Sequence, residues 1–413
     1  MKRRVVITGV GAITPIGKNV EEFWKGIKKG ECGIDEITAF DTTNFKVKLA
    51  AELKNYNPED YFEKREAKRL DKFSQYAIIA AREAWLDSKL NKEEINMERV
   101  GVILGSGIGG VETIEKENEK CITKGADRVS PMYIPMAISN MATGNVAIDI
   151  GVKGESIAMV TACATGTHCI GESFRMIKHG YQDIILAGGT EASITPLSIA
   201  GFTNIKALSK TEDKTRASIP FDKERNGFVM GEGAGIIVLE ELEHAQKRGA
   251  KIYAEIVGYG ATSDSYHITS PAPGGEGGAR AMKIAMEEAN VKPEEITYIN
   301  AHGTSTHLND LCETEAIKKA LGEENARKVM VSSTKGNIGH LLGAAGGVEA
   351  IICCKAIEDG FVPPTINYKI PDEDCDLDIV PNKGRNTEIK YAISNSLGFG
   401  GHNSSILLKK FYE

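Results

Sequence analysis

Short apolar, β-branched runs alternate with helical patterns along the whole chain. Such runs, bounded by glycine and polar residues, predict buried strands. The first series of strands is Val5–Val10, Val100–Leu104, Ile157–Val160, Ile184–Ala187 and Ile236–Glu240. The second series is Ala254–Val257, Ile296–Asn300, Val329–Ser332, Tyr391–Ser394 and Ser405–Leu408. Because helical segments separate the strands, the pattern predicts an α/β fold with largely buried sheets.

The two series of strands share one plan. In each, a turn after the third strand leads into a long helix rich in small residues, expected over Thr161–Gly180 and Ser333–Gly360. The matching strands do not recur at a constant offset, so the repeat is one of pattern. We therefore expect two duplicated, tightly joined halves, residues 1–250 and 251–413. The long mixed segment Gly189–Gly235 is expected to have a function, because long loops in compact domains usually do.

Cys163 lies at the predicted junction between a strand and a helix. The apolar run before it ends at Thr161, and the helical pattern after it ends near Gly180, a candidate C-terminal cap. Free N–H groups and the helix dipole at such a junction favour the thiolate, the nucleophilic form of cysteine. The alternative is a small apolar residue that fills a tight turn. The apolar face of this helix carries Ile170, Phe174 and Ile177.

Two histidines and a lysine follow strands of the second half. His302 comes straight after the strand Ile296–Asn300, and Lys335 and His340 come after Val329–Ser332. Ligands of open α/β sheets bind at the carboxyl ends of the strands. A single histidine there is more often a structural hydrogen-bonding group. Cysteine, two histidines and lysine in equivalent turns of two halves instead indicate one shared site.

The residue types of this set favour a carbon–carbon condensation. Cysteine can hold an acyl group as a thioester when N–H donors stabilise the carbonyl oxygen. Two neutral imidazoles can donate to a second carbonyl, which becomes enolate-like when a neighbouring carboxylate leaves as CO2. An ordinary Cys–His hydrolase needs one histidine and an orienting Asn or Asp, so the second histidine favours condensation.

Composition limits the class of protein. The chain has 413 residues, 41% of them hydrophobic, and a net charge of −7. It contains no apolar run of about 18 residues, and its amino-terminal segment alternates like a strand, so we expect neither a membrane span nor a signal peptide. Eight scattered cysteines without a CxxC pair favour a reducing cytoplasm over disulfides or zinc. The acidic balance disfavours nucleic-acid binding.

Several motifs in order along the chain carry a family resemblance. They are VVITGVGAITPIG, TACATGTHCIG, PFDKERNGFVMGEGAG, NAHGTST, STKGNIGHLLGAAGG and NSLGFGGHNSSILLKK. With them the chain resembles the elongating β-ketoacyl-acyl-carrier-protein synthases, most of all the synthase II class. The resemblance implies a thiolase-like fold of α/β/α/β/α layers, usually in a homodimer. It also implies decarboxylative condensation of an acyl thioester with malonyl-acyl carrier protein, releasing CO2.

The resemblance also implies roles for individual residues. Cys163 would be the acylated nucleophile, His302 and His340 would support decarboxylation, and Lys335 would order the charge around them. The N–H groups of Cys163 and Phe399 would form the oxyanion hole. Phe399, in a glycine-rich frame, would also move to admit the acyl group. Further contacts are implied for the phosphopantetheine arm, by Thr304 and Thr306, and for the acyl chain, by Ile108 and Phe202.

Two further sites are expected, one for a carrier protein and one for an ion. If Tyr61–Leu70 is helical, four basic residues share one face and suit an acidic acyl carrier protein, and Arg128 and Lys206 extend the patch. No cofactor is required, but the resemblance allows a structural monovalent cation, which relatives can hold. The basic residues are Lys64, Arg65, Lys68 and Arg69, and the cation residues are Asn300, Glu349, Ser394 and Asn395. Lys335 could pair with Glu349 instead.

Four departures from the family pattern are visible. His307 stands where relatives usually carry proline, Asn226 replaces a frequent aspartate, and Leu397 replaces a common phenylalanine. A Gly-Asn-Ile stretch, 336–338, stands where many relatives have Ser-Met-Thr. None of the four removes a reacting group.

Other functions remain open at this stage. A stand-alone polyketide ketosynthase would share every catalytic residue, whereas a non-catalytic partner subunit would lack the nucleophilic cysteine. A thiolase is disfavoured because the glycine-rich loop 398–403 carries no second cysteine. The segment Gly105–Gly110 matches a dinucleotide fingerprint, but it lacks the acidic residue expected after a following strand.

Overall fold

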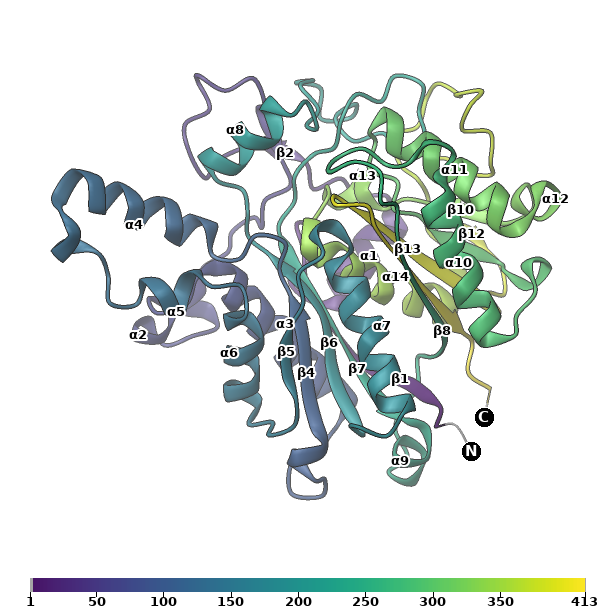
Figure 1. Ribbon diagram of the computed structural model, residues 1–413, viewed down its shortest axis with the longest axis horizontal. Coiled ribbons are helices and arrows are strands. Elements are labelled where there is room, and N and C mark those ends of the chain that lie inside the picture. The colour runs from purple at the N-terminus through teal and green to yellow at the C-terminus, as the bar shows by residue number, and fades with distance from the viewer. Residues whose placement is uncertain (1–2, 413) are drawn as a thin grey trace.

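Ten strands pair into one mixed sheet in the computed structural model, which describes residues 3–412 (Figure 1). All ten strands predicted from the sequence are found in it. They are β1 (Val5–Ile13), β4 (Val100–Gly105), β5 (Ser156–Ala158), β6 (Ile184–Glu191), β7 (Gly233–Glu241), β8 (Ala254–Ser263), β9 (Tyr298–Asn300), β10 (Met330–Ser332), β13 (Tyr391–Gly398) and β14 (His402–Lys409). Four two-residue strands were not predicted: β2 (Asp35–Glu36), β3 (Leu49–Ala50), β11 (Phe361–Val362) and β12 (Arg385–Asn386).

Helices fill the connections. The α-helices are α1 (Val20–Lys29), α2 (Lys64–Ala67), α3 (Lys72–Ser88), α4 (Val111–Lys124), α5 (Tyr133–Ala137), α6 (Met141–Ile150), α7 (Thr165–Lys178), α8 (Pro196–Asn204), α9 (Leu242–Lys247), α10 (Glu276–Ala289), α11 (His307–Leu321), α12 (Glu323–Ala326), α13 (Lys335–Ile338) and α14 (Ala345–Asp359). The 3-10 turns are η1 (Pro58–Asp60), η2 (Met97–Arg99), η3 (Ala126–Arg128), η4 (Ala162–Ala164), η5 (Pro273–Gly275), η6 (Pro293–Glu295) and η7 (Leu342–Ala344). Among the described residues, no helix combines the length and apolarity that crossing a membrane requires.

The strand order is the same in both halves of the chain. The first half runs β5-β4-β6-β7-β1 across the sheet, and the second half runs β10-β9-β13-β14-β8. In each half, the first three strands pair in parallel. The fourth strand pairs antiparallel to both the third and the fifth. The expected duplication is therefore confirmed by topology. The halves meet where β1 and β8 pair through three residues, so the five strands of each half join into one sheet.

Five layers stack around a central pair of helices. Helix α3 covers the outer face of the first half and α10 that of the second, whereas α7 and α14 each contact strands of both halves (Figure 1). Glycines allow the central helices to approach closely: a Cβ at Gly346 would lie 2.1 Å from Thr167 Oγ1. The order α/β/α/β/α confirms the predicted thiolase-like layering.

The helix that follows Cys163 ends as the sequence predicts. Gly180 has φ +82°, its N–H donates to Ile177 O at 3.0 Å, and the N–H of Tyr181 donates to Met176 O at 2.9 Å. This pair of bonds is the Schellman arrangement that closes a helix.

The long helix predicted over Ser333–Gly360 is wrong as a single element. It breaks after α13 at Gly339, whose φ of +69° is left-handed. His340 then pairs as an extended residue: its N–H donates to Val229 O at 2.7 Å and its carbonyl accepts from Gly231 N–H at 2.9 Å. These tertiary hydrogen bonds replace the helical ones, and α14 starts only at Ala345.

The helix predicted over Tyr61–Leu70 is also shorter than expected. Only α2, four residues long, is helical. The side-chain amide of Gln75 donates to the carbonyls of Ala67 (2.9 Å) and Leu70 (3.1 Å). These carbonyls are satisfied from α3 and not by continued helix, so the helical path ends there.

Candidate active site

The nucleophile candidate Cys163 lies in the tight turn η4, directly before α7. Ala162 takes a left-handed φ of +50° there, a costly conformation for a residue with a Cβ. The second half has the same device: Leu342 in η7 has φ +45° and precedes α14. The position equivalent to Cys163 is Gly343. Of these two equivalent positions, only Cys163 in the first half has a side chain, because the second half has glycine there.

The two histidines form a buried pair. The rings of His302 and His340 lie 5.2 Å apart between centroids, at 85° to each other, and the residues are 2% and 1% exposed. The carboxylate of Glu313 accepts the N–H groups of His302 (2.8 Å) and Gly303 (2.7 Å), which fixes the loop after β9. His302 Nδ1 and both ring nitrogens of His340 have no hydrogen-bond partner among the described residues. These nitrogens are therefore not engaged by other groups of the described protein.

Burial keeps both imidazoles neutral. It lowers the pKa of His302 and of His340 well below the usual value, and the nearby Lys335 ammonium lowers both further. Lys335 is itself buried at 2% exposure, donates to the carbonyl of His302 and pairs with Glu349. The pairing of Lys335 with Glu349, considered from the sequence, is therefore present. It keeps the positively charged Lys335 side chain close to the histidines.

The thiol of Cys163 is less acidic than the turn alone suggests. Burial raises its pKa to about 12, although the Lys335 charge and the N–H of Phe399 act in the opposite direction. Burial and the position of the turn before α7 act in opposite directions on the thiolate, and the thiolate expected from the helix terminus stays a prediction.

Phe399 connects the nucleophile with a row of aromatic rings. Gly398 packs so close to the nucleophile turn that a Cβ on it would lie 3.2 Å from Cys163 N. The Phe399 ring lies 6.3 Å from that of Phe202, which lies 5.6 Å from Phe228. Phe228 lies 5.2 Å from the ring of His340. The aromatic row therefore runs from the Phe399 loop to the histidine pair.

One cavity of about 320 Å³ brings the predicted residues together. Thr304 and Thr306, whose hydroxyls lie 3.0 Å apart, form part of its wall. Three departures from the family pattern also line it, namely Asn226, His307 and Leu397. The predicted site residues that line the cavity are Cys163, Phe202, His302, Thr304, Thr306, His340 and Phe399. The stretch 336–338 does not line it, and Asn337 instead donates to Glu31 O.

Ile108 does not line this cavity. It is 36% exposed and lies on the glycine-rich turn after β4. That turn surrounds a carboxylate of the protein itself: Glu191 accepts from Gly107 N–H at 2.7 Å and from Ser106 Oγ at 2.9 Å. Glu191 also accepts from Gly343 N–H of the second half, at 2.9 Å. The fingerprint-like glycines thus bind an internal anion and link the two halves.

Sequence reasoning missed several residues around the site. Glu313 and Glu191 fix backbone segments on either side of the cavity, and Phe228 and Asp264 line it. Glu191 lies four residues beyond the predicted strand Ile184–Ala187, and its partners come from other segments of the chain. Glu313 had no usable signal, because its partners lie in another segment.

The expected basic patch and cation residues lie outside the cavity. Lys64, Arg65, Lys68 and Arg69 are all exposed, on and just after α2. Asn300 and Ser394 are paired on the neighbouring strands β9 and β13. The amide oxygen of Asn395 instead accepts from Ser405 Oγ at 2.7 Å.

Comparison with known proteins defines the class to which this fold and site belong. The family model for the β-ketoacyl synthase N-terminal domain matches residues 2–245, and that for the C-terminal domain matches residues 253–369. The chain belongs to the β-ketoacyl synthase family.

Curated relatives extend the similarity over nearly the whole chain. The 3-oxoacyl-[acyl-carrier-protein] synthase 2 of Staphylococcus aureus (strain COL) is 56% identical over 409 residues, which cover 99% of each chain. The enzyme of the same name from Synechocystis is 50% identical over 411 residues, again 99% of each. Among solved structures, the ishigamide ketosynthase/chain length factor matches with a TM-score of 0.93 and 36% identity over the full length of both chains. A type II polyketide ketosynthase in complex with its acyl carrier protein matches with a TM-score of 0.92 and 36% identity, also over both full lengths.

Proposed function

We propose that this chain elongates fatty acyl groups by decarboxylative condensation. It joins an acyl thioester to malonyl-acyl carrier protein and gives 3-oxoacyl-acyl carrier protein, CO2 and free acyl carrier protein. One observation carries the proposal: a cysteine and two neutral, unpartnered imidazoles face a single cavity. The identity of 56% to a 3-oxoacyl-[acyl-carrier-protein] synthase 2 supports the same reaction.

The first step is acyl transfer to Cys163. The sulfur attacks the thioester carbonyl, the new carbon–sulfur bond forms, and the carrier-protein thiolate leaves. Because burial keeps the Cys163 thiol protonated at rest, its proton must pass to the departing thiolate as the bond forms. The N–H groups of Cys163 and Phe399 stabilise the oxyanion of the tetrahedral intermediate. Phe399 N–H is within hydrogen-bonding reach of the sulfur, which suits this role.

The second step makes the carbon–carbon bond. Malonyl-acyl carrier protein loses CO2, and the electron pair of the broken bond becomes an enolate on the thioester. His302 and His340 donate hydrogen bonds to the enolate oxygen, a role that fits neutral imidazoles without other partners. The enolate carbon attacks the acyl carbonyl on Cys163, and the cysteine leaves as thiolate and takes up one proton.

Lys335 acts through the histidines. Burial lowers the pKa of both imidazoles most, and the Lys335 ammonium lowers it further, while its contact with the His302 carbonyl fixes that loop. Glu349 balances its charge. Lys335 does not line the cavity, so it is a positioning residue for the reaction.

Acyl carrier protein is the expected partner. The structure of a relative holds a type II polyketide ketosynthase with its acyl-carrier protein. The exposed basic patch on and after α2, Lys64, Arg65, Lys68 and Arg69, is suited to an acidic carrier protein. We place carrier-protein docking on this patch, extended by Arg128 of η3 and by Lys206, both exposed.

A second copy of the chain is the other expected partner. Strand β5 forms one edge of the ten-stranded sheet, and Ile157 (37% exposed) and Val160 (50% exposed) lie on and after it. An exposed apolar edge strand is a favoured surface for strand pairing between chains. We therefore propose a homodimer that pairs through β5. Sedimentation equilibrium measures the mass of the assembly and so shows whether the chain is a dimer.

Three buried oxygen atoms of the cation residues named from the resemblance suit a monovalent cation. Asn300 Oδ1, Ser394 Oγ and Glu349 Oε2 all lack a hydrogen-bond partner among the described residues. A bound sodium or potassium ion would satisfy them and stabilise β9 against β13. Asn395 does not fit the expected set, because its amide oxygen is engaged by Ser405. The described residues contain no cluster of three His, Cys, Asp or Glu side chains suited to a metal ion.

The cytoplasm is the proposed location. All eight cysteines are free thiols, as expected of a chain that folds in a reducing compartment.

Polyketide synthesis is the second candidate function. It is supported by a solved type II polyketide ketosynthase with a TM-score of 0.92, but the identity of 36% is well below the 56% to the 3-oxoacyl-[acyl-carrier-protein] synthase 2. A non-catalytic partner subunit is disfavoured by Cys163 in the cavity.

Intact-mass analysis tests the proposal. The protein is incubated with acyl-acyl carrier proteins of graded chain length, and then with malonyl-acyl carrier protein. We expect one acyl group on Cys163 and its conversion to 3-oxoacyl product. The variant C163S should form no acyl enzyme, and the matched control C121S, at an exposed cysteine, should behave as wild type. Full elongation by C163S would overturn the proposal, and acylation only by polyketide-like acyl groups would favour the second candidate.

A further inference from the structure

His307 stands at the cavity of the proposed condensation. His307 is the first residue of α11, is exposed and lines the cavity. The family resemblance places proline at this position, so the imidazole is an addition. Its side chain has no hydrogen-bond or ion-pair partner among residues 3–412. A titratable group is thus presented to whatever passes into the cavity.

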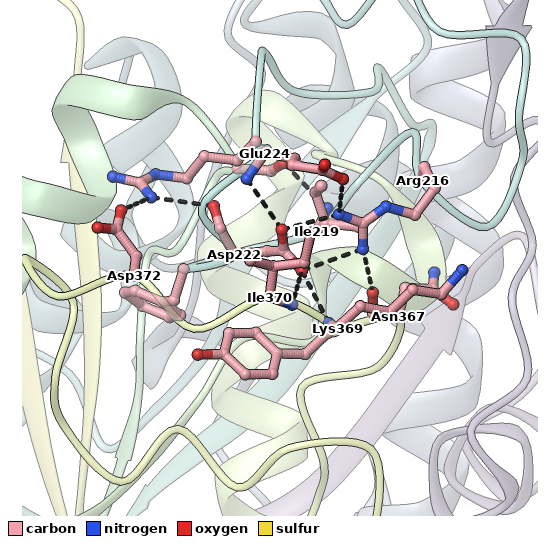
Figure 2. A network of polar contacts seen from close by, with 12 residues as sticks. Arg216, Ile219, Asp222, Glu224, Asn367, Lys369, Ile370 and Asp372 are labelled. Atoms are coloured by element: carbon pink, nitrogen blue, oxygen red, sulfur yellow. Dashed lines mark hydrogen bonds and ion pairs between the residues drawn. The ribbon is translucent and has the colours of Figure 1, made fainter.

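A buried network fixes the backbone that carries this imidazole. Arg225 donates to the carbonyl of His307 at 3.1 Å and to that of Asp222 at 3.0 Å, and it pairs with Asp372. Figure 2 shows how Asp222 is itself held, with both carboxylate oxygens bound by Arg216 at 2.8 and 3.0 Å. The side chain of Arg225 is fully buried. His307 is therefore held in place by a rigid support while its ring stays free.

The charged groups around His307 leave it available to an anion. Lys206, also exposed, lines the same cavity. Asp264 lines it too, but its carboxylate accepts from Asn403 at 2.8 Å and from Ala272 N–H at 3.0 Å. Asp372 is engaged by Arg225. Although burial opposes the shift, Arg225 and the nearby His307 hold the pKa of the Asp372 carboxyl below its usual value. Both carboxylates are thus occupied by other donors.

We propose that His307, together with Lys206, binds the phosphodiester of the phosphopantetheine arm. This inference rests on the proposed function. His307 and Lys206 are exposed and line the same cavity as Cys163, Thr304 and Thr306, so an arm that reaches Cys163 from solvent can bring its phosphate to them. As residue types, histidine gains positive charge between about pH 8 and 6, and lysine keeps its charge there. The proposal therefore predicts that recognition of the phosphate depends on pH.

Two small probes isolate the phosphate. One is S-hexanoyl pantetheine. The other is the methyl phosphodiester of S-hexanoyl phosphopantetheine, whose single negative charge does not change between pH 6 and 8. The second-order rate constant for acylation of Cys163 is measured by intact mass with each probe, at pH 6 and pH 8. At each pH, the rate constant with the phosphodiester is divided by that with the pantetheine. Any titration that affects acylation equally with both probes then cancels.

For the wild type we expect the ratio of phosphodiester to pantetheine to be about two- to five-fold larger at pH 6 than at pH 8, as for an exposed charge pair. In H307Q the ratio should stay above one, owing to Lys206, but lose its pH dependence. H307P should do the same, since proline is accepted at the first position of a helix. The matched control is H179Q, at an exposed histidine that ends α7, and it should keep the wild-type ratios.

The outcomes separate the inference from the proposed function. A wild-type ratio that does not change with pH, or a pH-dependent ratio that survives in H307Q and H307P, overturns the role of His307. If neither probe acylates Cys163 in the wild type, the proposed function fails and the inference fails with it.

Discussion

Burial sets the protonation state of the side chains that face the cavity. Cys163, His302 and His340 are each at most 9% exposed, and desolvation disfavours the charged form of all three. The consequence differs between them. Neutral imidazoles are ready to donate, but a neutral thiol is a poor nucleophile and must lose its proton during the reaction.

The thiol gives the first prediction. Because burial raises the pKa of Cys163 to about 12, only a small fraction is thiolate near neutral pH. As long as the pH is below the pKa, the thiolate fraction rises about tenfold for each unit by which the pH increases. Alkylation of Cys163 by iodoacetamide, followed by peptide mass analysis, should accelerate about tenfold per unit from pH 7 to 9 without a plateau. A plateau below pH 8 would show that the turn stabilises the thiolate after all.

The imidazoles give the second prediction. H302A and H340A should each slow CO2 release from malonyl-acyl carrier protein by about 10²- to 10³-fold, the usual loss for one donor to a developing oxyanion. Acylation of Cys163 should continue in both, which separates this effect from misfolding. Because the pKa of each imidazole lies well below its usual value, the wild-type decarboxylation rate should not fall between pH 8 and 6. A fall with a midpoint near 6.5 would contradict neutral imidazoles.

Among the elements, strands were predictable and helix ends often were not. A buried strand can be predicted from a continuous apolar run such as Ile184–Ala187, because both faces of the strand need apolar side chains. The break at Gly339 had no such local signal. It depends on two backbone hydrogen bonds, one from His340 N–H to Val229 O and one from Gly231 N–H to His340 O, between segments about a hundred residues apart in the chain. The end of α2 depends likewise on Gln75 of the next helix.

The short helix α2 carries the third prediction. K64E/R65E reverses two charges of the basic patch, which should raise the KM for acyl-carrier-protein substrates about five- to fifty-fold and change kcat less than two-fold. Steady-state kinetics at low and high salt measure both constants. The difference in KM between K64E/R65E and the wild type should be smaller at high salt. The control K283E/K292E makes the same change in net charge on the far helix α10 and its following turn, at two exposed lysines. An unaltered KM in K64E/R65E would remove the patch from the docking surface.

At the scale of the molecule, the site exists because two halves share one inner layer. Cys163 comes from the first half, and His302 and His340 come from the second. The equivalence of their turns could be inferred from the sequence, because each follows a predicted strand. What the sequence could not supply were the groups that join the halves. Glu191 reaches Gly343, and Gly346 meets Thr167, only once both halves are folded.

The contact between the central helices carries the last prediction. In G346A the added Cβ would lie 2.1 Å from Thr167 Oγ1 and 2.4 Å from Thr167 N, so α7 and α14 must separate. Overpacking of this kind costs about 1–3 kcal/mol of the free energy of unfolding. Since α7 begins two residues after Cys163, acylation of the cysteine should slow as well. G144A adds the same methyl group in α6 with no atom within 4 Å, and should leave stability unchanged or raised by about 0.5–1 kcal/mol. Denaturant unfolding and the acylation rate together decide: if G346A matched G144A in both, the close approach of the two helices would not be what holds the nucleophile in place.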